Sequence, residues 1–160
     1  MPKAAQGRKP GASAVETTHL VLPQDTNTHG TAFGGRIMEW MDVAAGICAG
    51  RHSEGPVVTV AVDDLHFAKP IRMGDVVIVR AAVNHTWRTS MEVGVRVERE
   101  QAYTGEREHC LSAYFTFVGV DAQGAPRAVS PLLPKTADEL RRFDNAIQRR
   151  GLRLKRRELP

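Results

Sequence analysis

The chain has 160 residues, of which 42% are hydrophobic and 25% charged, and its formal net charge is +4. This length and composition are typical of one globular domain in solution. No run of ~18 or more apolar residues occurs, which excludes a membrane-spanning helix and membrane insertion. The basic N-terminal segment lacks the apolar stretch of a secretory signal, so we expect a flexible tail over residues 1–14.

The elements are taken in chain order. Residues 15–22 predict a short strand, and residues 23–30 predict a polar loop. Residues 34–49 predict a helix that is apolar over most of its circumference, which indicates a buried helix. Asp42 lies on the narrow polar stripe of that helix, beside Glu39.

Beyond the helix the apolar residues recur with period two. They predict strands over residues 57–67, 76–83, 90–100 and 111–117. We expect an irregularity in the first of these near Asp63-Asp64. The third strand alternates apolar and charged side chains, which predicts a sheet with one solvated face.

The C-terminal part predicts an amphipathic helix over residues 136–150, with Leu140, Phe143 and Ile147 turned inward. Residues 135–157 carry nine basic and three acidic side chains. They form either a solvated basic helix or a surface for a polyanion. Nucleic acid is disfavoured as a partner because no nucleic-acid-binding motif accompanies the charge.

These elements predict an α+β fold in which an antiparallel sheet wraps around one long central helix, with a second helix at the C-terminus. We divide the chain into a tail (1–14), a domain (15–134) and a basic helix with tail (135–160). Cys48 and Cys110 each lie in an apolar run. We expect buried free thiols, and hence a reducing compartment such as the cytoplasm.

Common catalytic motifs are absent: the sequence contains no G-x-S-x-G, P-loop, G-x-G-x-x-G or H-E-x-x-H pattern. None of the histidines has a helical i, i+4 partner, and the cysteines lack metal-ligand spacing. We therefore expect no metal site, and disfavour a metalloenzyme or a serine hydrolase.

Two local features could carry chemistry. Gly34 and Gly35 open the predicted helix, where free amides could bind a developing oxyanion; alternatively they only permit a tight turn. Asp42 could act as a base or nucleophile if it is partly removed from water; alternatively it is solvated beside Glu39.

The spacing of these features has a consequence for assembly. Eight residues separate Gly34 from Asp42, which is ~12 Å along a helix axis. One reacting carbon cannot touch both ends of that span within one chain. If both act on one substrate, the second group comes from another subunit, which predicts an oligomer with sites at the interface.

Three segments carry a family resemblance that runs in register from about Thr17 to Arg127. They are residues 23–42, PQDTNTHGTAFGGRIMEWMD; residues 67–75, FAKPIRMGD; and residues 88–93, RTSMEV. The chain resembles the acyl-CoA hydrolase branch of the hotdog thioesterases. The resemblance implies a hotdog fold, a homodimer at least, and commonly a hexamer built as a trimer of dimers.

The resemblance also implies roles for single residues. Asn27 would position the water or the thioester, an amide of Gly34 or Gly35 would polarise the carbonyl, and Asp42 of the facing subunit would be general base or nucleophile. In the third segment Arg88, Thr89 and Ser90 would line the path of coenzyme A. Arg127 and the basic C-terminal segment would contact its phosphates, whereas Asp63 and Asp64 would be structural.

The leading hypothesis is thus an enzyme that hydrolyses acyl-CoA to acid and coenzyme A without metal or redox cofactor. A second hypothesis is a non-catalytic acyl-CoA-binding module with a regulatory role, since fold does not fix function. The presence of both Asn27 and Asp42 favours the enzyme. A third, a nucleic-acid-binding protein that uses the basic tail, would require binding that survives loss of the core pocket.

Overall fold

A computed structural model describes residues 6–159 of the chain. One five-stranded sheet, all of its pairs antiparallel, has the strand order β1-β3-β4-β5-β2. The strands are β1 (Val15–Leu20), β2 (Val57–Val62), β3 (Val76–Thr86), β4 (Ser90–Glu100) and β5 (Arg107–Gly119), and the helices are α1 (Gly34–Ser53) and α2 (Ala137–Arg157). Short 3-10 turns, η1 (Pro10–Ala12) and η2 (Pro23–Asp25), flank β1. The predicted hotdog architecture is confirmed.

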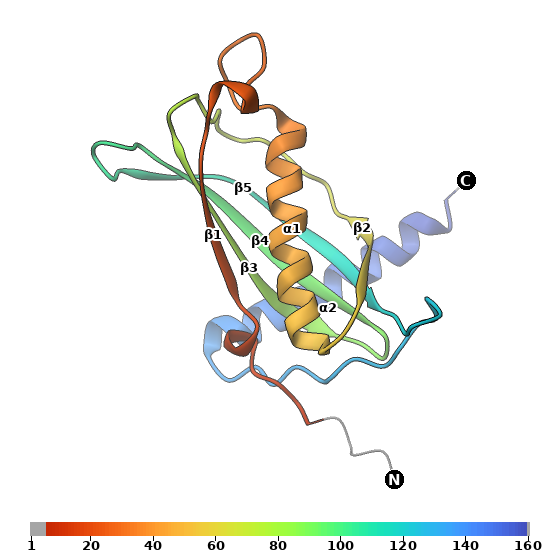
Figure 1. The fold of residues 1–160 in the computed structure, drawn as a ribbon. Coiled ribbons are helices and arrows are strands. Elements are labelled where there is room, and N and C mark those ends of the chain that lie inside the picture. The colour runs from red at the N-terminus through yellow and green to blue at the C-terminus, as the bar shows by residue number, and fades with distance from the viewer. Residues whose placement is uncertain (1–5, 160) are drawn as a thin grey trace.

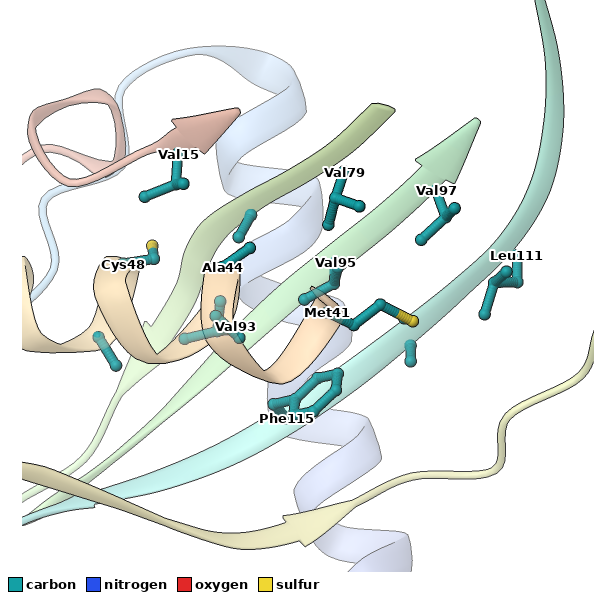
Figure 2. Packing of buried hydrophobic residues seen from close by; sticks show 14 of the residues in the cluster. Val15, Met41, Ala44, Cys48, Val79, Val93, Val95, Val97, Leu111 and Phe115 are labelled. Carbon is teal, nitrogen blue, oxygen red and sulfur yellow. The ribbon is translucent and has the colours of Figure 1, made fainter. Parts of the chain in front are cut away.

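The sheet curls around α1, which lies along its concave face (Figure 1). The core forms between the two because one side of α1 and alternate residues of the strands are apolar. Figure 2 shows Met41, Ala44 and Cys48 on the helix and Val93, Val95 and Phe115 on the strands; all six are buried. At ~25 cal/mol per Å² of apolar area, this burial is the main stabilising contribution to the fold.

The opposite flank of α1 is not covered by any other part of residues 6–159. Val43 is 56% exposed and Met38 is 43% exposed, although both are large and apolar. The prediction of a fully buried helix is therefore only half correct for one chain. Beside this flank runs β2, an edge strand whose far side has no partner strand among the described residues.

The alternation in β4 predicted that the second face of the sheet is solvated. Part of that face is instead covered. Helix α2 crosses behind the sheet (Figure 1) and buries Glu92 completely. Thr136 and Glu139 cap the start of α2 reciprocally, each side chain accepting from the other's backbone amide. Phe143 is turned toward the core, but Leu140 and Ile147 are 45% and 48% exposed, which corrects their predicted inward orientation.

Several boundaries differ from the predicted ones. Strand β2 ends at Val62, and its irregularity lies between Thr59 and Ala61 rather than at Asp63-Asp64. Helix α1 runs four residues further than predicted, to Ser53, and ends where Glu54 adopts a left-handed conformation with φ 53°.

Part of the predicted N-terminal tail is ordered on the domain. Residues 1–5 lie outside the described residues, but Arg8 forms a bridge with Leu132 and an ion pair of 3.0 Å with Glu54. No helix within residues 6–159 is both long and apolar enough to cross a membrane.

Candidate active site

The loop before α1 is fixed by Asp25, a residue that the sequence did not single out. Its carboxylate accepts the amide of Leu22 at 2.9 Å and pairs with Arg36 on the first turn of α1 at 3.1 Å. Its carbonyl accepts the amide of Phe33 at 2.7 Å. This buried acid therefore ties both ends of the loop to the start of the helix.

Asn27 organises the tip of the same loop. Its Oδ1 accepts the amides of His29 at 2.9 Å and Thr31 at 3.3 Å, and its Nδ2 donates to Thr31 Oγ1 at 2.9 Å. The carboxamide is thus held in one orientation on an exposed surface. Because an amide nitrogen has two N–H groups, one of them is left to donate to a ligand.

Gly34 and Gly35 begin α1, and no side chain caps this end. The amide of Arg36 already donates to Phe33 O. Within residues 6–159 neither glycine amide has an acceptor, as expected for the first positions of a helix. A Cβ on Gly35 would lie 2.6 Å from the Phe33 ring, and one on Gly34 would lie 3.4 Å from Phe67. The glycines therefore leave two amides open beside two aromatic rings.

Asp42 lies near the middle of α1, on the flank that the sheet does not cover. Its Oδ1 accepts a hydrogen bond of 2.9 Å from Thr59 Oγ1 on β2. The sequence analysis missed Thr59. The available signal was a lone polar residue in the apolar run of residues 57–62.

The first two motif segments meet in space. Residue Thr31 pairs with Arg72, and the amide of Ala32 donates to Ile71 O. The third segment lies elsewhere: the hairpin between β3 and β4 is at the opposite end of the sheet from the Gly34-Gly35 turn (Figure 1). Within one chain the two glycines therefore lie far from the hairpin.

The hairpin residues have defined contacts. Thr89 O accepts the amide of Gly119 at 2.9 Å, and Arg88 O accepts the amide of Val129 at 3.1 Å, while the Arg88 side chain is exposed. Ser90 Oγ accepts from Arg150 Nη1 at 3.3 Å. The turn is thus anchored by its backbone and leaves side chains at the rim of the sheet.

Arg127 holds the far end of α1. Its Nη2 donates to Ser53 O at 3.0 Å and its Nε to Val120 O at 3.4 Å. Gly55 makes room for this guanidinium, since a Cβ there would lie 2.5 Å from Nη2. Two of the three side-chain nitrogens of Arg127 therefore donate to backbone oxygens.

Asp63 and Asp64 do not form a paired-carboxylate site. Asp63 pairs with Arg153 at 2.7 Å and Asp64 with Arg156 at 3.2 Å, so both tie α2 to the segment after β2. Among the described residues, no three or more His, Cys, Asp or Glu side chains come together as potential metal ligands.

The sequence is similar to those of known proteins. The family model of the thioesterase superfamily matches residues 29–106. The acyl-CoA thioester hydrolase YkhA of Bacillus subtilis is 39% identical over 145 residues, which cover 91% of this chain and 84% of the relative. The acetyl-coenzyme A thioesterase of Rattus norvegicus is 40% identical over 150 residues, but the match spans only 27% of its length.

Solved structures of acyl-CoA thioesterases and hydrolases are similar to this fold. A hexameric acyl-CoA thioesterase superposes with a TM-score of 0.94 at 38% identity, over 97% of this chain and 99% of the other. An acyl-CoA hydrolase of Staphylococcus aureus in complex with butyryl coenzyme A and coenzyme A has a TM-score of 0.89 at 35% identity, over 94% and 92%. Variants of that hydrolase with an aspartate, an asparagine or a threonine replaced by alanine are also among the solved structures.

Proposed function

This chain belongs to the acyl-CoA thioester hydrolases of the thioesterase superfamily, and from that membership we propose that it hydrolyses acyl-CoA at sites built by two copies of the chain. The products are a free carboxylic acid and coenzyme A. Coenzyme A is part of the substrate, and the proposal requires neither a metal nor a redox cofactor. We place the reaction in the cytoplasm, in keeping with the two buried free thiols.

The position of Asp42 carries the proposal. The acid lies on an uncovered flank of α1 among exposed apolar side chains such as Met38 and Val43, beside the free edge of β2. A soluble protein rarely leaves such a surface open. A second copy laid across it would exclude water from Asp42 and bring in its own Gly34-Gly35 turn.

The groups then divide between the two copies. One supplies the amides of Gly34 and Gly35, which stabilise the oxyanion, and the free N–H of Asn27, which orients the thioester or the water. The other supplies Asp42, oriented by Thr59. In the general-base route Asp42 takes a proton from a water molecule, and the oxygen of that water attacks the thioester carbon. The C–S bond then breaks, and the thiolate of coenzyme A takes up the proton.

A second route starts from the same geometry. Asp42 attacks the thioester carbon directly, the thiolate leaves, and water hydrolyses the resulting mixed anhydride. A single turnover in water labelled with heavy oxygen tests for the anhydride. Label in the side chain of Asp42 requires this intermediate, because water has then attacked it at the Asp42 carbon, whereas the general-base route labels only the released acid.

The β3–β4 hairpin is the proposed contact for coenzyme A. Arg88, Thr89 and Ser90 lie at the rim of the sheet. Arg127 would contribute through Nη1, since Nη2 donates to Ser53 O at the end of α1 and Nε donates to Val120 O. Relatives assemble as hexamers, and we propose that this chain forms a homodimer that assembles further into a trimer of dimers.

Replacement of Asp42 by alanine tests the site. We expect kcat to fall by at least ~100-fold across a panel of acyl-CoA substrates, because a positioned base or nucleophile is lost. The oligomeric state should not change. Asp144→Ala is the matched control, since Asp144 is an exposed acid on α2 that forms no ion pair among the described residues.

Two outcomes would contradict the proposal. Comparable hydrolysis by the wild type and by Asp42→Ala would remove Asp42 from the mechanism. Tight binding of acyl-CoA by a wild type that releases no free coenzyme A would instead support the regulatory binding module.

A further inference from the structure

The arginines of α2 that face the sheet differ in their partners. Arg149 pairs with Glu92 at 2.6 Å, Arg153 with Asp63 at 2.7 Å, and Arg156 with Asp64. Their charges are therefore compensated within the chain. Three of the nine basic residues of the C-terminal segment therefore hold α2 to the sheet or to the segment after β2.

Arg150 is the exception among them. Its guanidinium carbon lies 4.3 Å from the centroid of the Trp87 ring, and its Nη1 donates to Ser90 Oγ at 3.3 Å. Within residues 6–159 no carboxylate lies within ion-pair distance of it. Burial, and then the neighbouring charges of Arg153 and Arg157, lower the pKa of Arg150. A half-buried cation is thus held next to like charges without a counter-charge.

A stack of aromatic rings lies at the surface that holds Arg150. The His85 ring stacks on Trp87 at 4.4 Å between centroids and on Phe143 of α2 at 3.9 Å. The stack joins the hairpin to α2 through three rings. Because Arg150 lies on the indole face, its N–H groups are fixed in direction at little further cost in entropy.

The location connects Arg150 to the proposed site. Ser90, its hydrogen-bond partner, precedes Met91, which pairs with Phe117; Phe117 pairs in turn with Thr59, the partner of Asp42. Two strand spacings, about 10 Å, therefore separate β4 at this rim from β2 at Thr59, with α2 and α1 on opposite faces of the sheet (Figure 1). The exposed side chain of Arg88, on the same hairpin, also has no acidic partner within the described part of the chain.

We propose that Arg150, together with Arg88, binds a phosphate group of the coenzyme A nucleotide. The proposal rests on the proposed function, and within the basic C-terminal segment it assigns the phosphate contact to a single residue, Arg150. A phosphate would supply the missing counter-charge. A guanidinium can offer it two parallel N–H donors, the geometry in which arginine binds phosphate best.

The test compares two substrates that differ only in the nucleotide: an acyl-CoA and the corresponding acyl-pantetheine. For Arg150→Gln we expect KM for acyl-CoA to rise about tenfold, as for the loss of one charge-assisted hydrogen bond. We expect kcat to change by less than about twofold, and acyl-pantetheine kinetics to be unaffected. Arg150→Lys, which keeps the charge, should recover part of the affinity.

A matched control lies on the same helix. Arg141 is exposed and pairs with Asp138 one turn away, so Arg141→Gln removes one positive charge at another place on α2. It should leave KM for acyl-CoA unchanged. The 3′-dephospho form of the substrate identifies the group that is bound: a selective loss with the full substrate assigns the 3′-phosphate, and equal losses with both assign the pyrophosphate.

Two results would overturn the proposal that Arg150 binds a phosphate. If Arg150→Gln raises KM for acyl-CoA and acyl-pantetheine alike, Arg150 only supports Ser90; if neither KM changes, the phosphates bind elsewhere. Either result overturns the proposal while the Asp42 assignment stands. If the wild type hydrolyses no acyl-CoA, the proposed function fails, and calorimetric affinities of coenzyme A and pantetheine for both proteins still decide this proposal.

Discussion

The acid proposed for catalysis has one hydrogen-bond partner among the described residues, the hydroxyl of Thr59. This bond fixes the rotamer of Asp42, because the acid is otherwise on an exposed helix flank. Thr59→Val keeps the shape of the side chain and removes the donor. We expect kcat to fall about tenfold with KM nearly unchanged, since orientation of the reacting group is lost and binding is not.

Thr59→Ser is the control for that measurement, because it retains the hydroxyl. Its kcat and the pH profile of its kcat/KM should match those of the wild type. If valine and serine at this position behave alike, the hydrogen bond has no part in orienting Asp42.

The two thiols give a prediction about reactivity. Burial raises the pKa of Cys48 to about 11 and also raises that of Cys110. At pH 8 only about one Cys48 in a thousand is thiolate, so a disulfide reagent should leave the folded protein unmodified. The chain unfolded in guanidinium should react at both cysteines. Fast modification of the folded protein would contradict the burial of these thiols.

The same shift affects stability at alkaline pH. An unfolded Cys48 loses its proton near its ordinary pKa of 9.0, whereas the folded one keeps it up to about 11. Between these values the folded state binds more protons, so the free energy of unfolding falls as pH rises.

Local spacing in the sequence predicted where single residues lie. Gly34 and Gly35 are at the start of α1 and Asp42 is on its exposed side, as predicted, and their catalytic roles stay predictions. Thr59 could not be found that way, because its role depends on how β2 packs beside α1, 17 residues along the chain. Asp25 was missed for a related reason, since a loop carries no periodicity to mark a buried acid.

At the scale of elements, α2 is attached to the sheet by a buried ion pair. Glu92 is fully buried, and Arg149, which also lies over the Tyr114 ring, meets its carboxylate at 2.6 Å. Arg149→Met should reduce the free energy of unfolding by about 3 kcal/mol, because it leaves a buried carboxylate with only Arg153 as a charged partner. Urea denaturation measures the loss.

A double-mutant cycle isolates the pair. With Glu92→Met added to Arg149→Met, no buried charge remains uncompensated, and we expect most of the lost stability to return. Additive losses in the double variant would show that the two residues contribute independently, and the buried pair would not be what holds α2.

The sequence predicted the order of the elements because each carries its own apolar period. The prediction that the apolar residues from Met91 to Val97 form the inner face of β4 is confirmed. The prediction that Glu92, on the outer face, is solvated is wrong. Periodicity shows which side of a strand is apolar. It does not show that an arginine-rich helix from the far end of the chain will cover the polar side.

At the scale of the whole molecule, the described part of one chain leaves an apolar flank of α1 and the edge of β2 without cover. Val43, 56% exposed, lies on that flank. A charge there cannot be buried without a partner, so Val43→Glu should shift the protein to monomers and reduce kcat by at least ~100-fold. Light scattering with chromatography measures the mass, and Gln148→Glu, exposed on α2, is the control. An active monomer would contradict a shared site.

The spacing of ~12 Å between Gly34 and Asp42 predicts more than an oligomer; it predicts that two defective chains can repair each other. Asn27→Ala and Asp42→Ala should each be nearly inactive alone. In a random mixture half of the dimers contain one copy of each, and each mixed dimer holds one intact site out of two. We therefore expect the mixture to recover about a quarter of wild-type activity, because the intact Asn27 and Asp42 meet across the interface. If each site were built within one chain, co-refolding the two variants would restore no activity.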